Sequence, residues 1–143
     1  MKNHYHVYIA SGFFTLEQIE EIEFIKGELS KRGLTFFSPK DEAIVEPNAE
    51  TDWRQEVFAG NCLALQRSDM VIVNTNNKDM GTLFEAGYAY ALNKPIIYVC
   101  FQLGPNGQLN LMLSESGVAS CTTREQLCQA LDGKKIYWEG LIE

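Results

Sequence analysis

The stretch 70-MVIVNTNNKDMGTLFEAGYAYALNKPIIYVC-100 decides how this chain is expected to fold. It opens with a β-branched strand, Met70–Val73, passes through a turn-prone loop, Asn74–Asp79, and continues as an apolar helix over Met80–Asn93. Lys94-Pro95 ends the helix, and a second apolar strand follows at Pro95–Cys100. A strand, a helix and another strand in this order are typical of a parallel sheet covered by helices.

The same alternation of strands and helices continues on both sides of this stretch. Before it, His6–Ala10 and Leu34–Ser38 are predicted strands, and the helix between them starts with a capping-box pattern at Thr15 and Gln18. Gly33 ends that helix. The other predicted elements are helices at Leu16–Arg32 (apolar stripe Leu16, Ile19, Ile22, Ile25 and Leu29), Asp52–Arg67, Leu109–Leu113 and Thr123–Leu131, a polar loop at Pro39–Pro47 and a strand at Gly117–Cys121.

These elements predict a single domain over residues 1–143 with an α/β fold. Five strands in so short a chain indicate a flavodoxin-like, doubly wound five-stranded parallel sheet with helices on both faces. In that topology ligands bind beyond the carboxyl ends of the first and third strands, where the strand order reverses. Ser11-Gly12-Phe13 and Asn74–Asp79 follow these two strands. We therefore expect the functional site to lie between them.

Charge and composition exclude several classes of partner. The formal net charge of −7 opposes binding to nucleic acid or to an anionic membrane surface, because phosphates would be repelled. No window approaches the roughly 20 apolar residues of a membrane span. The four cysteines show no CxxC pattern, which favours a reducing compartment, and we predict the cytoplasm. His4 and His6 share a strand face without a third ligand, so no metal site is predicted.

Glu85 is the one charged side chain between Met80 and Asn93. On a helical wheel its face is uncharged, and burying a carboxylate without a partner costs several kcal/mol. One interpretation is a structural glutamate that accepts a hydrogen bond from the backbone or a tyrosine; the other is a functional carboxylate facing a ligand. The residues on its own helix leave both open. The residues that share its face are Gly81, Thr82, Tyr88, Ala89 and Leu92.

Four neighbours in the predicted crevice also have two interpretations. Asp79 is placed to cap the helix of Glu85, and one of its oxygens would remain free for a ligand. Asn61 is mildly unfavourable inside a helix and is explained either by a back-bond to the chain or by a ligand. Tyr8 is by default a core aromatic whose hydroxyl needs a partner. Asn110 is either a helix cap or a polar group for binding.

Three segments, 7-VYIASGFF-14, 79-DMGTLFEAGYA-89 and 109-LNLM-112, resemble the nucleoside 2-deoxyribosyltransferase family. The resemblance implies that Glu85 is the catalytic nucleophile, that Tyr8 orients its carboxylate, and that Asp79 contacts the base and assists its departure. It also implies that Asn110 and Met112 complete the site of a neighbouring subunit and bind the sugar hydroxyls. The remaining substrate-binding candidates are Ser11, Gly12, Phe13, Asp41 (in the loop 38-SPKDEA-43), Asn61 and Gly81.

Two departures from the family pattern concern base preference. Some relatives carry an aspartate at the position of Asn61, and some end in a tyrosine that enters the site, where this chain has Leu141-Ile142-Glu143. Both differences alter groups that would contact the base, and neither removes a group needed for the reaction.

The resemblance implies exchange of the base of 2'-deoxynucleosides, purine or pyrimidine, by a double displacement through a deoxyribosyl ester of glutamate. No metal or organic cofactor is expected. The apolar run Leu109–Leu113 and the aromatic tail predict a homo-oligomer, and the resemblance suggests a hexamer built as a trimer of dimers. A deoxynucleotide N-hydrolase of the same fold is an alternative, as is a nucleoside-binding module without catalysis.

Overall fold

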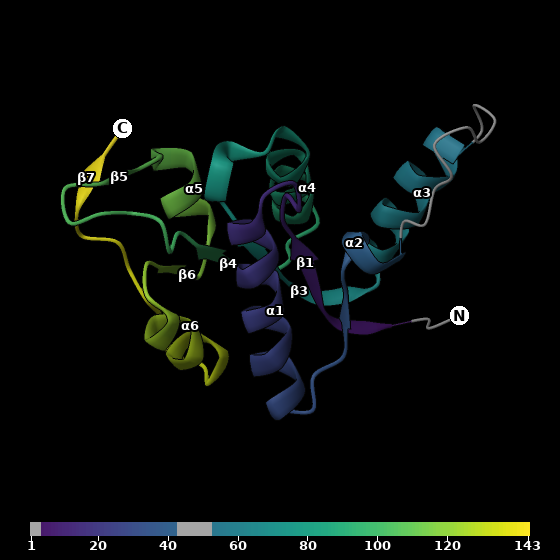
Figure 1. Cartoon of the computed structure of the whole chain (residues 1–143), viewed down its shortest axis with the longest axis horizontal. Coiled ribbons are helices and arrows are strands. Elements are labelled where there is room, and N and C mark those ends of the chain that lie inside the picture. The colour runs from purple at the N-terminus through teal and green to yellow at the C-terminus, as the bar shows by residue number, and fades with distance from the viewer. Residues whose placement is uncertain (1–3, 43–52) are drawn as a thin grey trace.

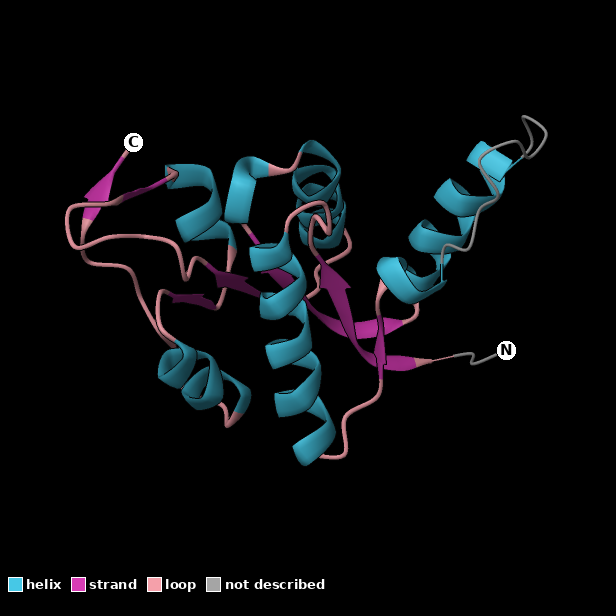
Figure 2. Ribbon diagram, viewed as in Figure 1, coloured by secondary structure: helices cyan, strands magenta, loops and turns pink. Residues whose placement is uncertain are grey.

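The computed structural model describes residues 4–42 and 53–143, and five parallel strands form the centre of the molecule (Figures 1 and 2). Their spatial order is β2-β1-β3-β4-β6, and each neighbouring pair is parallel. This is the flavodoxin-like order, in which the chain reverses its direction of winding between β1 and β3. The predicted fold class is therefore confirmed. The strands are β1 (Tyr5–Ala10), β2 (Phe36–Phe37), β3 (Ser68–Asn74), β4 (Ile96–Val99) and β6 (Ala119–Cys121).

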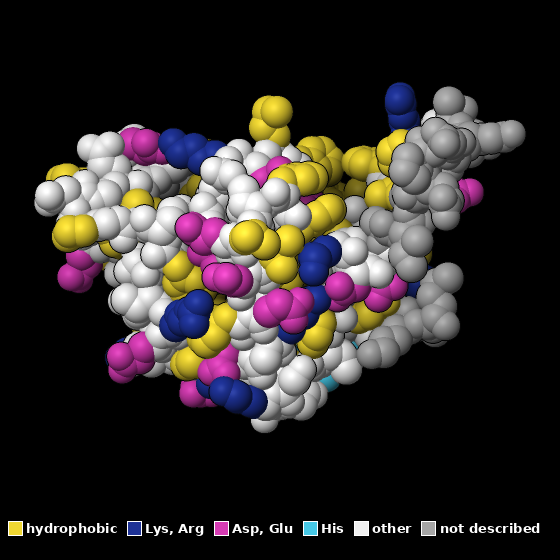
Figure 3. All heavy atoms as spheres, viewed as in Figure 1, with side chains coloured by type: hydrophobic (Ala, Val, Ile, Leu, Met, Phe, Trp, Pro, Cys, Tyr) yellow, Lys and Arg dark blue, Asp and Glu magenta, His cyan; other side chains and the backbone are white. Residues whose placement is uncertain are grey.

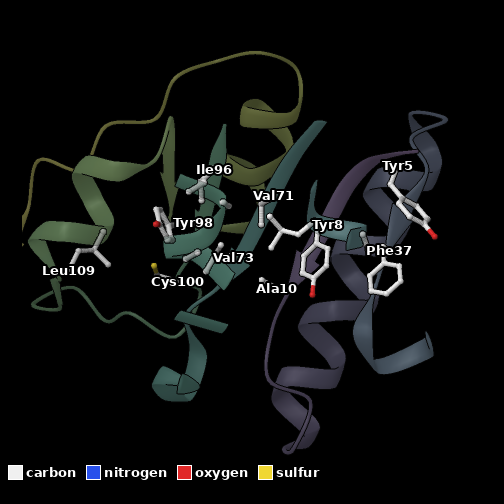
Figure 4. Packing of buried hydrophobic residues seen from close by; sticks show 14 residues of the cluster. Tyr5, Tyr8, Ala10, Phe37, Val71, Val73, Ile96, Tyr98, Cys100 and Leu109 are labelled. Atoms are coloured by element: carbon white, nitrogen blue, oxygen red, sulfur yellow. The ribbon is translucent and has the colours of Figure 1, made fainter. Parts of the chain in front are cut away.

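Helices cover both faces of the sheet and divide its core into two clusters. On one face, α1 (Leu16–Lys31) and α6 (Arg124–Leu131) pack against Val7, Ile72 and Ile97. On the other face, α3 (Trp53–Gln66) and α4 (Met80–Ala91) pack against a second set of buried side chains, part of which Figure 4 shows. Each strand thus contributes alternate residues to the two clusters, as the period of a strand requires.

The predicted helix ends agree closely with the structure because local chemistry sets them. The Thr15 side chain accepts from the Gln18 amide, and the full capping box predicted from the sequence is present. Asp79 and Thr123 cap α4 and α6 in the same way. Gly33 has a φ of +67°, which is the left-handed conformation that follows many helices.

Two expectations for the first half of the chain need correction. Leu16 is 81% exposed, although it was predicted on the buried stripe, because it occupies the first position of α1, more than a turn before the packed residues Ile22, Ile25 and Leu29. The predicted polar loop begins with a short helix, α2 (Pro39–Glu42). Residues 43–47 of that loop and Asp52, the predicted start of α3, lie outside the described residues.

The end of the chain forms a small second sheet that the sequence did not predict. β7 (Leu141–Ile142) pairs in parallel with β5 (Gln108–Leu109), so Leu109 belongs to a strand, and α5 (Leu111–Ser116) begins only after Asn110. Trp138 donates its indole N–H to the Leu141 carbonyl at 2.9 Å and packs against the core. A 3-10 turn, η1 (Asn76–Lys78), completes the loop after β3. Within residues 4–42 and 53–143, no helix combines the length and apolar character that crossing a membrane would need.

Candidate active site

Glu85 and Tyr8 meet at the face of the sheet that α4 covers. Tyr8 lies in the middle of β1, is completely buried, and donates its hydroxyl to the Glu85 carboxylate. Its ring stacks on Phe37 of β2, with centroids 5.4 Å apart and an angle of 19° between the planes, and Figure 4 shows the two rings side by side. The stacking fixes the direction of the hydroxyl. The tyrosine partner that a buried Glu85 required is therefore present, across 77 residues of sequence.

The environment of Glu85 keeps a proton on its carboxyl group up to neutral pH. Burial raises the pKa of Glu85 from 4.5 to about 7, the Tyr8 hydrogen bond acts in the opposite direction, and the charge of Asp79 adds to the increase. The pKa of Tyr8 is also raised, by burial and then by the Glu85 charge, so the hydroxyl remains a donor. A carboxyl group with a pKa close to neutral, held in one direction, is typical of functional sites.

Glu85 opens onto a pocket of about 300 Å³ between α3 and α4. The wall is largely apolar, and Phe58 and Phe84 face each other across it with ring centroids 5.9 Å apart. Hydrophobic side chains gather on the surface where α4 faces α3 (Figure 3), and both phenylalanines are exposed there. A pocket with a few polar groups among aromatic side chains suits a small planar ligand. The lining residues are Phe58, Asn61, Cys62, Leu65, Gly81, Phe84 and Glu85.

Asn61 and Gly81, two of the substrate-binding candidates, are thus brought together with Glu85. Cys62 lies beside them in the lining of the pocket and is half-buried. Burial, followed by the charge of Glu85, raises the pKa of the Cys62 thiol, so it stays protonated. Cys100, in contrast, is buried in the core.

Asp79 stands at the start of α4, close to the loop that follows β1. One of its oxygens accepts from both the backbone N–H and the hydroxyl of Thr82, each at 2.9 Å, which leaves the other carboxylate oxygen for a further partner. A Cβ at Gly12 would lie 3.2 Å from the Asp79 Cβ and 2.5 Å from the Gln18 amide nitrogen. Only glycine allows this close approach of the loop to the carboxylate. Capping and ligand binding by Asp79 are therefore compatible.

A buried polar network, which the sequence did not reveal, holds the two loops of the crevice in place. Asn74 and Asn76 each donate their amide to Glu21 of α1, at 3.2 and 2.7 Å. The Ser11 hydroxyl accepts from Asn74 at 3.1 Å, and Gln18 donates to the Asn76 carbonyl at 3.0 Å. The one signal in the sequence is a run of asparagines after β3, which is equally typical of an ordinary turn.

The other candidates lie at different places around the crevice. Ser11 is buried within the network, whereas Phe13 is half-buried and stacks on Phe14 with centroids 4.9 Å apart. Asp41 is exposed on α2, where it pairs with Lys26 of α1 at 2.6 Å.

Asn110 and Met112 lie at the start of α5, outside the Glu85 pocket of their own chain. Asn110 caps α5 by accepting from the backbone of Met112 at 2.9 Å, and the Met112 side chain is 74% exposed. The two side chains therefore do not contribute to the pocket of the same chain.

The histidines near the amino terminus have local partners. His4 lies 2.7 Å from Asp69, and the His6 ring accepts from the Thr35 backbone at 2.9 Å. In the part of the chain that the structure describes, no three side chains of His, Cys, Asp or Glu converge as a metal site would require.

Comparison with known proteins decides the family. The sequence matches the family described as nucleoside 2-deoxyribosyltransferase over residues 7–127. The chain belongs to this family. The resemblance carried by the segments around Tyr8, Glu85 and Asn110 is thereby confirmed.

Three solved structures resemble this chain at different levels of similarity. A 2-deoxyribosyltransferase from Bacillus psychrosaccharolyticus is 28% identical, with 92% of this chain and 98% of that chain covered and a TM-score of 0.78. A conserved protein from Enterococcus faecalis V583 is 15% identical, with coverage of 98% and 82% and a TM-score of 0.56. A CMP N-glycosidase from Clostridium botulinum is 16% identical, with coverage of 88% and 97% and a TM-score of 0.56. The last two share the fold alone. Among curated protein sequences, no match is found.

Nucleoside 2-deoxyribosyltransferases and their relatives are catalytic and bind nucleosides and nucleobases as small-molecule substrates. In this member, the Glu85 pocket combines a half-buried carboxylate, a tyrosine that orients it and an aromatic wall. It is accordingly the candidate site for these molecules.

Proposed function

We propose that the protein exchanges the nucleobase of 2'-deoxyribonucleosides, with Glu85 as the covalent nucleophile. The observation that carries this proposal is the position of the Glu85 carboxylate, which is oriented by a fully buried tyrosine and faces a pocket lined with aromatic side chains. Membership of the nucleoside 2-deoxyribosyltransferase family supports the same reaction.

The first half-reaction breaks the N-glycosidic bond. A Glu85 oxygen attacks C1' as the bond to the base breaks, the bonding electrons leave with the base, and the base gains a proton from the protonated form of Asp79 or from a neighbouring acid. Positive charge develops at C1' and the ring oxygen, and it forms more readily in a 2-deoxy sugar because the electron-withdrawing 2'-hydroxyl is absent. The product is a deoxyribosyl ester of Glu85 and a free base.

The second half-reaction reverses these steps with a different base. A ring nitrogen of the acceptor attacks C1' from the face opposite the ester, the carboxylate leaves, and the acceptor's proton returns to the group that protonated the first base, Asp79 or the neighbouring acid. Two inversions give net retention of configuration at C1', and no oxidant, metal or organic cofactor is consumed. Kinetics are expected to be ping-pong.

Neighbouring side chains supply binding rather than chemistry. Phe13, Phe58 and Phe84 offer aromatic faces to a planar base, and Asn61 offers one donor group and one acceptor oxygen to its edge. Some relatives carry a charged aspartate at this position. The neutral amide of Asn61, in contrast, adds no charge beside Glu85. It therefore favours contact with both donor and acceptor groups of a base.

We also infer that a neighbouring subunit completes the site with its own copies of Asn110 and Met112. Neither residue lines the Glu85 pocket of its own chain, and exposed apolar side chains occur on α4 and at the start of α5. The expected assembly is a homo-oligomer, a hexamer built from dimers. Sedimentation of a fully active monomer would contradict this assembly and leave the chemistry of Glu85 untouched.

Incubation with thymidine, with and without adenine, tests the reaction. Transfer predicts formation of deoxyadenosine only when adenine is present, with slow release of thymine in its absence. Rapid cleavage without an acceptor would favour hydrolysis, the activity that the name of the Clostridium botulinum neighbour indicates for that protein. No change in either nucleoside would favour a binding module.

Mass spectrometry of protein quenched during turnover tests the covalent step. The expected result is a deoxyribosyl adduct on the peptide that contains Glu85, absent from Glu85→Gln and present in Glu20→Gln, an exposed glutamate of α1 that serves as the matched control. An adduct on another residue would overturn the assignment of the nucleophile.

A further inference from the structure

Helices α1 and α6 both begin with a threonine cap and a glutamine three positions later, and the two glutamines differ in what their amide groups do. At α1, the side-chain oxygen of Gln18 accepts from the backbone N–H groups of Phe14 at 2.9 Å and Thr15 at 3.2 Å. At α6, the side-chain oxygen of Gln126 accepts from the backbone N–H of Thr122 at 2.8 Å. Glutamate serves as well as glutamine at this position of a cap, because the cap uses only the side-chain oxygen. Capping therefore does not explain why Gln18 carries an amide group.

The amide group of Gln18 joins α1 to the loop that follows β3. Its nitrogen donates to the backbone carbonyl of Asn76 at 3.0 Å, across 58 residues of sequence, and Gln18 is only 1% exposed. Gln126 is half-buried, and within residues 4–42 and 53–143 it makes no hydrogen bond to a second loop. Gln18 thus links the loop after β1, through Phe14 and Thr15, with the loop after β3, through Asn76.

Asp79 lies next to this link. A Cβ at Gly12 would lie 2.5 Å from the Gln18 amide nitrogen and 3.2 Å from the Asp79 Cβ, so both side chains pack against the same side of the glycine. Asp79 also follows directly after the η1 turn, which begins at Asn76. The Gln18 amide therefore contacts both segments of the crevice, one with Phe13 and one with Asp79. A shift of about 1 Å between such segments can slow a reaction about 100-fold.

We propose that Gln18 is a positioning residue of the base-exchange reaction, whose amide group holds Asp79 where it can pass a proton to the departing base. The role of Gln18 rests on the proposed function, because it depends on Asp79 as the proton donor named there. Gln18 does not line the Glu85 pocket, so it acts through the two loops and takes no part in making or breaking bonds. The base leaves with the bonding electrons of the glycosidic bond, and the proton moves from Asp79 to the base.

Gln18→Glu, compared with Gln126→Glu, isolates the amide group. Both variants keep the oxygen that caps the helix. Gln18→Glu replaces the donor to the Asn76 carbonyl by an acceptor and brings a second carboxylate to Asn76, beside Glu21. Gln126→Glu makes the same chemical change at α6, away from the crevice, and is the matched control.

Hydrogen–deuterium exchange of the full chain measures the link between the loops without any need for activity. In Gln18→Glu, the backbone amides of residues 74–79 should exchange about five-fold faster than in the wild type, which is the effect of one lost hydrogen bond. Gln126→Glu should leave exchange in this loop unchanged. Equal exchange in Gln18→Glu and the wild type would show that the amide does not hold the loop, and would overturn the proposal.

A comparison of two leaving groups tests the role in catalysis. With adenine as the acceptor, kcat/KM for the donor nucleoside reports the first half-reaction alone in a ping-pong scheme. Fluorine stabilises negative charge on the departing base, so 5-fluoro-2'-deoxyuridine depends less on a proton donor than thymidine does. We expect Gln18→Glu to lower kcat/KM about ten-fold for thymidine and about two-fold for the fluorinated nucleoside. Gln126→Glu should match the wild type for both.

Equal losses for the two nucleosides would overturn the proposal, because they would leave Gln18 with a structural role only. A wild-type chain that exchanges no bases would refute the proposed function and this role of Gln18 with it, whereas the hydrogen exchange would still show whether Gln18 joins the loops. Should Gln18→Glu fail to fold, Gln18→Met and Gln126→Met repeat the comparison without an added charge. A loss that is larger for thymidine in Gln18→Met alone supports the proposal, and equal losses contradict it.

Discussion

Two carboxylates on opposite faces of the sheet, the buried Glu21 and the half-buried Glu85, differ in almost every respect. Glu21 of α1 accepts hydrogen bonds from the amides of Asn74 and Asn76 and lies inside the network that joins the crevice loops. Glu85 of α4 accepts from Tyr8 and otherwise faces a pocket. One oxygen of Glu21 accepts from two amides of the protein, whereas Glu85 accepts from one hydroxyl and retains acceptor capacity directed at its pocket.

The difference explains why burial alone does not indicate function. Burying a carboxylate is tolerated when the fold supplies its hydrogen bonds, and Glu21 then acts as a fixed support for two loops. Glu85 lacks that supply, and its pKa is raised to about 7, mainly by burial. A carboxylate left short of donors next to a pocket can interact more strongly with positive charge that develops on a bound molecule in the transition state, which is the condition for catalysis by that group.

The largest expected effect separates the two carboxylates by activity. Glu85→Gln removes the nucleophile but keeps its shape, so base exchange between thymidine and adenine should fall about 10⁴-fold or more, as for other covalent nucleophiles. Initial rates measured by liquid chromatography check this. Glu20→Gln, on the exposed face of α1, should retain the wild-type rate. A Glu85→Gln rate within ten-fold of wild type would remove Glu85 from the mechanism.

The same substitution should stabilise the folded protein at high pH. Because the pKa of Glu85 is about 7 in the folded protein and 4.5 as its reference value, the folded state holds a proton that the unfolded chain has lost between these values. Stability therefore falls as the pH rises through this window. At 1.36 kcal/mol per pH unit, Glu85→Gln should raise the free energy of unfolding by about 3 kcal/mol at pH 8.

Urea unfolding of both proteins at pH 8 and pH 4 measures this difference. The two curves should converge at pH 4, where Glu85 is protonated in both folded and unfolded states to a large extent. If Glu85→Gln lowered the free energy of unfolding equally at pH 8 and at pH 4, the fold would stabilise the ionised Glu85 carboxylate as well as the protonated one. The contrast with Glu21 would then disappear.

The contrast between the two carboxylates also shows what a sequence can reveal. Glu85 was found because its helix is otherwise uncharged, which is a local signal within fourteen residues. Glu21 gave no such signal, because other charges surround it on α1 and its partners Asn74 and Asn76 lie 53 and 55 residues away. Long-range hydrogen bonds between side chains leave no periodic pattern in the sequence.

Prediction of the fold from the sequence shows the same difference between local signals and long-range contacts. Strand and helix positions and helix caps were predicted because apolar periodicity and capping residues act over a few positions, and the strand order then followed from the fold class. The β5–β7 sheet was missed, since each strand has two residues and their pairing joins segments about thirty positions apart. The roles of Asn110 and Met112 remain predictions, because they depend on a second copy of the chain.

Glu21→Ala should separate the structural role of Glu21 from the catalytic role proposed for Glu85. It removes the acceptor from Asn74 and Asn76, although Ser11 and Glu17 still accept from these amides, so the free energy of unfolding should fall by about 2 kcal/mol. The acid limb of base exchange should stay at the same pH, since Glu21 does not face the pocket. Urea unfolding and a pH–rate profile measure the two quantities, with exposed Glu20→Ala as the control. A displaced acid limb would make Glu21 part of the site.

Tyr8→Phe should produce the smallest effect and the most specific one. The Tyr8 hydrogen bond holds the pKa of Glu85 below the value that burial alone would give, so its loss should raise that pKa further. The acid limb of kcat/KM, expected near pH 7, should therefore move to higher pH, and exchange at pH 7 should fall about ten-fold. Tyr5→Phe, on the same strand and also packed against Phe37, should leave the profile unchanged. If Tyr8→Phe lowered the rate equally at every pH, the tyrosine would contribute to packing alone, and its hydroxyl would not distinguish Glu85 from Glu21.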